Sequence, residues 1–123
     1  MRRNPFLLSI LAVALLVMVS QAESKTDRED HQSFTNKTDV RQLTFDVPAM
    51  TKKLRLRVKV VLQSGRASWV LRDPNGTAHI NGAGSSGHLA GDTGEIEAIA
   101  GAWVLELKLD NATGTSQVNW ASH

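Results

Sequence analysis

An eight-residue run near the middle of the chain alternates basic and apolar side chains. Residues 53–60 read Lys-Leu-Arg-Leu-Arg-Val-Lys-Val. A helix would scatter the four apolar side chains around its circumference, whereas a strand places all four on one face. The run therefore predicts a β-strand that buries its apolar face and presents a basic face to solvent.

The same two-residue period recurs along the rest of the chain. Alternating apolar residues mark strands at 43–47, 66–72, 102–110 and 117–122, with a shorter and less regular case at 95–99. Each of the three tryptophans falls on an apolar face: Trp69, Trp103 and Trp120. Because the chain contains few other large side chains, we expect these three rings to form much of the core.

Turn-forming residues separate the predicted strands. Ser64-Gly65 and residues 110–114 read as turns, and Asp73-Pro74-Asn75-Gly76 has Pro and Asn-Gly where a tight turn favours them. Residues 81–94 hold five glycines and predict a long mobile loop, with room for a short strand at 88–90. No segment after residue 22 has a helical period. The expected fold is all-β, a small antiparallel β-sandwich of jelly-roll type.

The N-terminus has the three parts of a secretory signal peptide. Arg2 and Arg3 precede an apolar stretch at residues 6–19, and Ser20-Gln21-Ala22 supplies small residues for a signal peptidase. Fourteen helical residues span ~21 Å, which is short of a ~30 Å hydrocarbon core. We therefore predict cleavage after Ala22, a secreted or periplasmic product, and no transmembrane anchor after cleavage.

The seventeen residues that follow are polar. Residues 23–39 contain one large apolar side chain, Phe34, and show no periodicity. This composition predicts a disordered leader that follows the signal-peptide helix. The expected organisation is a signal peptide at 1–22, the leader at 23–39 and one β-sandwich domain at 40–123.

The charge of the chain depends on whether the signal peptide is counted. The 123 residues hold 14 Lys and Arg against 12 Asp and Glu, and Arg2 and Arg3 account for the whole surplus of +2. A neutral remainder argues against general affinity for nucleic acid. The absence of cysteine excludes disulfides and thiolate metal sites.

The basic strand supplies the candidate binding residues. Lys53, Arg55, Arg57 and Lys59, called the basic row below, project from one face over ~20 Å at ~3.3 Å per residue. Such a row suits an anionic glycan, an envelope surface or another protein. The alternative is a solvated face whose cations pair with Glu95, Glu97, Glu106 or Asp110.

Other residues permit catalytic or metal-binding hypotheses. A small hydrolase could use His79, His88, Ser85 or Ser86 with Asp92, but no G-x-S-x-G elbow is present. Residues 82–87 match G-x-G-x-x-G, yet no helix follows them, as a dinucleotide site requires. We therefore predict a non-enzymatic protein without a cofactor.

Several Asp and Asn residues fall in predicted turns. Calcium could take oxygen ligands from Asp73, Asn75, Asn81, Asp92 and Asp110, although no dense D-x-D-x-D run supports it. Asn36, Asn75 and Asn111 begin N-x-T sequons, which would carry glycans only in a eukaryotic secretory pathway. Turn chemistry explains these Asp and Asn residues equally well.

Three segments carry a family resemblance. They are Ala67-Ser-Trp-Val-Leu-Arg-Asp-Pro-Asn-Gly-Thr77, Gly101-Ala-Trp-Val-Leu-Glu-Leu107 and Thr113-Gly-Thr-Ser-Gln-Val-Asn-Trp120. This pattern resembles the P domain of proprotein convertases and the bacterial pre-peptidase C-terminal domains. The resemblance implies a jelly-roll β-sandwich and an accessory, non-catalytic role beside a secreted peptidase; some family members bind calcium. This chain departs from the pattern in its short glycine-rich segment between Thr77 and Gly101, and we expect no attached peptidase.

Together these observations predict an exported, non-catalytic β-sandwich that serves as a binding or accessory module at the cell envelope or outside the cell. Two alternatives stay open: the small secreted hydrolase described above, and a structural subunit that assembles through a strand edge. The sequence leaves the oligomeric state open.

Overall fold

The computed structural model describes residues 26–123, and these residues form strands without a helix. The strands are β1 (Thr26–Val47), β2 (Lys53–Arg72), β3 (Ala78–Gly84), β4 (Gly87–Asp92), β5 (Ile96–Glu97) and β6 (Gly101–Ser122). Within this part of the chain, therefore, no helix is long and apolar enough to cross a membrane. The signal peptide predicted at residues 1–22 lies outside the described residues.

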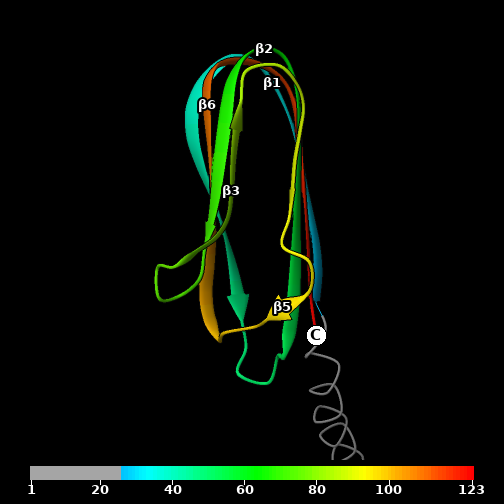
Figure 1. The fold of residues 1–123 in the computed structure, drawn as a ribbon, viewed down its shortest axis with the longest axis vertical. Helices are drawn as coiled ribbons and strands as arrows, with labels where there is room; N and C mark the ends of the chain where they lie inside the picture. The colour runs from blue at the N-terminus through cyan, green and yellow to red at the C-terminus, as the bar shows by residue number, and fades with distance from the viewer. Residues whose placement is uncertain (1–25) are drawn as a thin grey trace, which may run out of the picture.

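All strand pairs are antiparallel, and the sheet order is β1-β6-β2-β3, with β4 and β5 also paired to β2. The three long strands bend near their middles, so the sheet folds over on itself into two layers (Figure 1). We call the layer that contains residues 26–34, 53–62, 87–97 and 114–122 sheet I. Sheet II contains residues 39–47, 66–72, 78–84 and 101–109. The predicted all-β antiparallel sandwich is confirmed.

The core lies between the two sheets and is built around the tryptophans. Trp120 of sheet I stacks on Phe45 of sheet II with ring centroids 4.4 Å apart, and it meets Trp103 edge-on at 6.1 Å. Trp69 is also buried, so all three predicted core tryptophans are confirmed. The Trp103 indole donates a hydrogen bond to the Ile99 carbonyl over 2.8 Å, which satisfies its buried polar atom.

The bends are strand irregularities rather than turns between strands. Asn36 in β1 and Asn111 in β6 adopt positive φ angles of 45° and 48°. The backbone N–H of Asn36 donates to Thr113 Oγ1, and the backbone N–H of Asn111 donates to Thr38 Oγ1, both over 2.9 Å. The predicted turns at Ser64-Gly65 and at residues 110–114 are thus wrong, because the backbone continues its ladder through each bend.

The predicted disordered leader is wrong from Thr26 onward, since residues 26–39 belong to β1. Residues 26–34 pair with residues 114–122 of β6, and Phe34 is 8% exposed within the core. The polar composition of this segment reflects its position at the edge of the sandwich, where one side of the strand stays in solvent. Residues 23–25 lie outside the described residues.

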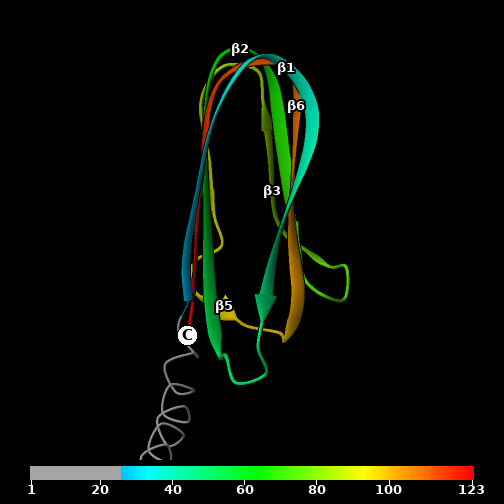
Figure 2. The ribbon, with the colours of Figure 1, turned by 180° about the vertical axis from the view of Figure 1, so that it is seen from behind.

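Strand β1 runs along the side of the sandwich that Figure 2 shows, and its charged side chains link the two layers there. Arg28 donates to the Thr44 carbonyl over 2.8 Å and lies 4.8 Å from the Phe45 ring centroid. Asp30 pairs with Arg41 at 3.2 Å, which links the two halves of the strand. Inward charges of this kind keep an edge strand from pairing with another chain.

The glycine-rich segment is not the mobile loop that the sequence predicts, because it forms two short strands that each pair with β2, one in each sheet. Strands β3 and β4 occupy most of it, and β4 includes the short strand expected at residues 88–90. A Cβ at Gly82 would lie 2.4 Å from the Trp69 ring, and one at Gly91 would lie 3.1 Å from Trp69 Nε1. Gly82 and Gly91 therefore make space for a core tryptophan, and the match of residues 82–87 to a dinucleotide motif occurs in strands without the helix that such a site requires.

Candidate binding face

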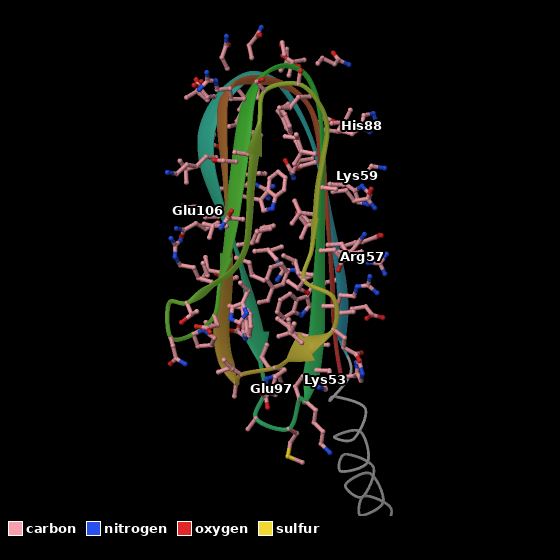
Figure 3. All side chains as sticks on the ribbon, in the orientation of Figure 1. Lys53, Arg57, Lys59, His88, Glu97 and Glu106 are labelled. Carbon is pink, nitrogen blue, oxygen red and sulfur yellow. The ribbon has the colours of Figure 1, made fainter. Side chains whose placement is uncertain are left out.

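The basic row lies on the outer face of sheet I, as its alternation predicts. All four cations are exposed, while the residues between them, Leu54, Leu56 and Val58, are buried. Figure 3 shows Lys53, Arg57 and Lys59 pointing away from the core on the same side of the molecule as His88. Glu106 points away from the opposite side.

One member of the row is held by an acid. Arg55 Nε donates to Asp92 Oδ1 over 2.9 Å, and Arg55 Nη2 donates to Asp92 Oδ2 over 2.7 Å. This bidentate pair, together with the Gly94 amide, holds the pKa of Asp92 well below its usual range. Both side chains stay more than 40% exposed, so solvent screens the pair and its contribution to stability is small.

The other three members form no ion pair with any acid in residues 26–123. Of the acids named as alternatives, Glu97 lies opposite Lys53 in the ladder without a salt bridge. Glu106 points away from the opposite side of the molecule, and Asp110 lies opposite Arg66 in the ladder, away from the row. Glu95 instead lies 3.4 Å from His123. Of the four cations, therefore, only Arg55 forms the ion pair that the alternative requires, and its partner is Asp92 instead of one of the four acids named there.

The contact of Asp92 with the basic row is the feature of this face that the sequence did not predict. It lies 37 positions after Arg55 and reaches it only because β4 pairs with β2. The alternation within β2 carries no information about which strand lies beside it. A carboxylate near the end of a predicted glycine-rich loop offered no sign of this contact.

The cations border a floor of small and amide side chains from β6. Ala121 lies opposite Arg55, Asn119 opposite Arg57 and Gln117 opposite Lys59. On the other side of β6 lies strand β1, in which Asp27 lies opposite Ala121 and Glu29 lies opposite Asn119. Going from β1 to β2, the face thus runs from carboxylates through amides to cations.

Two shallow depressions mark this face. One, of about 380 Å³, lies between Asp27 and Glu29 on one side and Arg55 and Arg57 on the other, over Asn119. The second, of about 400 Å³, lies beside Arg57 and Lys59 and is bordered by Asp92. Arg57 and Asn119 line both, and Asn119 Oδ1 is buried without a hydrogen-bond partner.

No Trp or Phe side chain is exposed on this face within the described residues. All three tryptophans, and with them Phe34 and Phe45, are buried in the core. A ligand here would be held mainly by charge and hydrogen bonds, because no indole or phenyl ring is exposed for stacking against a sugar or a base.

The residues of the hydrolase alternative are not brought together. His79 Nε2 lies 2.9 Å from Asp73 Oδ2, and its ring packs 4.9 Å from the Trp103 ring. Asp92 is held by Arg55 instead. Ser85 and Ser86 lie in the β3–β4 connection, and His88 lies on the outer face of sheet I, opposite Val61.

Two of the calcium candidates, Asp73 and Asp92, are engaged in local structure. Asp73 Oδ1 accepts hydrogen bonds from the Asn75 and Thr77 amides, which is the turn role of an Asx residue. Asp92 holds Arg55 and the Gly94 amide. Among residues 26–123, no group of three or more His, Asp or Glu side chains is placed to hold a metal.

No protein-family model matches the chain, and no curated protein matches it either. Among solved structures, it is similar to the pre-peptidase C-terminal domain of a collagenase from Bacillus anthracis, with a TM-score of 0.52 and 18% identity over 76% of this chain and 88% of that one. The PBSX exported protein XepA gives a TM-score of 0.52 at 11% identity, over 80% of this chain and 37% of that one.

A carbohydrate-binding module from Cellvibrio mixtus lichenase 5A, solved with cellotriose, is more distant: the TM-score is 0.39 at 15% identity, over 80% of this chain and 85% of that one. At these identities, the likenesses describe the fold alone. The resemblance noted in the sequence to pre-peptidase C-terminal β-sandwich domains is confirmed at that level.

Proposed function

We propose that the protein is an exported, non-catalytic binding module whose outer face on sheet I holds an acidic glycan. The observation that carries the proposal is the basic row, in which Lys53, Arg57 and Lys59 form no ion pair within residues 26–123 and lie beside two depressions that share Arg57 and Asn119. Arginine and lysine bind carboxylate or sulfate groups, and Arg does so with two parallel hydrogen bonds.

The rest of the face favours a glycan over a uniformly anionic surface. Asp27 and Glu29 lie across β6 from the row, and Asp92 lies beside the row on β4. These carboxylates repel a lipid headgroup layer or a nucleic-acid backbone. They accept hydrogen bonds from hydroxyl groups, as do the amide oxygens of Asn119 and Gln117. An acidic glycan presents both anions and hydroxyls.

Export is part of the same proposal and rests on the sequence of residues 1–22, which lie outside the described structure. A charged n-region, a short apolar stretch and a small-residue cleavage site together direct a chain across a membrane. Acidic polysaccharides are ligands that a secreted or periplasmic protein could reach.

The proposal is tested by retention on immobilised alginate and heparin, with neutral dextran as the reference, over a range of salt concentrations. We expect retention on the acidic polymers that weakens as salt rises. The double variant Arg57→Glu/Lys59→Glu should lose at least tenfold in affinity at low salt. The matched control is Arg66→Glu/Arg72→Glu, which changes the net charge equally on the outer face of sheet II.

The control should stay within about twofold of the wild type. An equal loss in both double variants would mean that net charge and not this face determines binding. Absence of salt-sensitive retention on either acidic polymer would contradict the proposal. Binding to anionic phosphatidylglycerol vesicles without glycan retention would assign the face to a membrane surface instead.

A further inference from the structure

The two lateral edges of the sandwich are protected very differently. Strand β1 forms one edge of both sheets, carries eight charged residues, and closes its side with the inward groups of Arg28, Asp30 and Arg41. Strand β3 forms the opposite edge of sheet II and reads Ala-His-Ile-Asn-Gly-Ala-Gly. It has no Lys, Arg, Asp, Glu or Pro, which are the residues that keep an edge from pairing.

The partly exposed apolar side chains of the core gather on the side of β3. Ile80 of β3 and Leu89 of β4 pack against the core but remain partly accessible, and Ile96 and Ile99 continue this side. Figure 1 looks onto it, with β3 on one layer and the chain from β4 to β5 on the other. The buried Trp69 Nε1 beneath Gly91 has no hydrogen-bond partner. The core is therefore less completely covered here than along β1.

We propose that β3 pairs antiparallel with β3 of a second copy of this chain, which joins the two copies of sheet II into one continuous sheet. A twofold axis at Asn81 places Asn81 opposite its own copy, His79 opposite Ala83, and Ile80 opposite Gly82. The interface is isologous, and each large side chain faces a small one.

The sequence of β3 is suited to pairing with β3 of a second copy. Pairing of the strand with itself brings no like charges together. On the core side, Ile80 of each copy lies beside the Trp69 ring that covers Gly82 of the other copy, because that ring extends across Gly82 toward the edge. The backbone groups along the outer side of β3 gain the ladder hydrogen bonds that an edge strand lacks. The inference is independent of the glycan proposal, which concerns sheet I.

The test measures the mass of the purified protein by light scattering across a concentration series without glycan. We expect a dimer that dissociates on dilution. Asn81 is exposed and faces its own copy, so Asn81→Lys and Asn81→Glu should each weaken dimerisation at least tenfold by placing like charges opposite each other. An equimolar mixture of the two variants should dimerise at least tenfold more tightly than either alone.

The matched control is Ser33→Lys, an exposed position on the opposite edge, which should leave the dimer unchanged. Urea midpoints show whether each variant is folded. A wild-type protein that is monomeric at millimolar concentration overturns the proposal. So does a dimer that Ser33→Lys weakens and Asn81→Lys does not, or a mixture that fails to restore association.

Discussion

Asp73 organises the turn between β2 and β3 through both of its oxygens. Oδ1 accepts the Asn75 and Thr77 amides at 2.8 and 3.0 Å, and Oδ2 lies 2.9 Å from His79 Nε2. The hydrogen bond with His79, followed by those from the two amides, lowers the pKa of Asp73 against the opposing effect of burial. A single carboxylate thus fixes the turn and holds His79 against the Trp103 ring.

This geometry predicts acid sensitivity with a definite sign. Because the folded pKa of Asp73 is depressed, its stabilisation is present above the unfolded pKa of about 3.9 and is lost as pH falls through the folded pKa. We expect the urea concentration at the unfolding midpoint of the wild type to decrease as the pH is lowered below about 4. Asp73→Asn should show a shallower fall over that range and a lower midpoint at pH 7.

Asp92 has a depressed pKa as well, so Asp92→Asn serves as the comparison. Its side chain is far more exposed than that of Asp73, 42% against 4%. Its substitution should change the acid slope less than Asp73→Asn does. Identical acid profiles for Asp73→Asn and the wild type would contradict the role given to Asp73.

At the scale of elements, the bends within β1, β2 and β6 fold the sheet into two layers instead of one. Gly65 of β2 has a φ of 83°, and a Cβ there would lie 2.1 Å from the Asn111 carbonyl oxygen in β6. Gly114 of β6 is similarly close to the Val61 carbonyl oxygen of β2. At the bend, the two central strands therefore approach so closely that only glycine fits.

Gly65→Ala should destabilise the protein by more than about 2 kcal/mol. The alanine would have to adopt a left-handed backbone conformation, and its Cβ would clash with the backbone of β6, which cannot move aside. Gly76→Ala is the control, since its φ is 86° but nothing lies within 4 Å of the added Cβ. It should cost only about 1 kcal/mol. Urea unfolding followed by tryptophan fluorescence measures both, and equal losses would show that the contact at the bend is unimportant.

For the whole molecule, the N-terminal half of β1 decides how far the domain extends. Residues 26–34 cover the β6 edge of sheet I, and Phe34 enters the core. Arg28 and Asp30 of this segment also bond to Thr44 and Arg41 on the other layer. The segment therefore belongs to the folded domain.

A chain that begins at Thr26 should unfold at the same urea concentration as the chain that begins at Glu23. A chain that begins at Val40 should lose at least about 3 kcal/mol, since removing the Phe34 side chain alone costs about that much and the β6 ladder is lost with it. Near-UV circular dichroism and urea unfolding compare the three. Equal stability of the shortest chain would restore the idea of a dispensable leader.

Much of the fold could be predicted from local pattern. The alternation in residues 53–60 correctly placed Leu54, Leu56 and Val58 inside and the basic row outside. The predictions failed where strands met other strands. Residues 26–39 lack an apolar period, because their inward positions carry Arg28 and Asp30, which are satisfied only by groups on the other half of β1.

The sequence by itself determined the strand character of this chain and the inward face of most strands, because side-chain alternation is a property of neighbouring residues. Only the tertiary structure decided that Gly65 and Asn111 mark bends within strands, that Asp92 holds Arg55, and that Gly82 and Gly91 make space for Trp69. Each of these depends on contacts between residues far apart in the chain. Such contacts exist only once the long strands have paired and folded over into two layers.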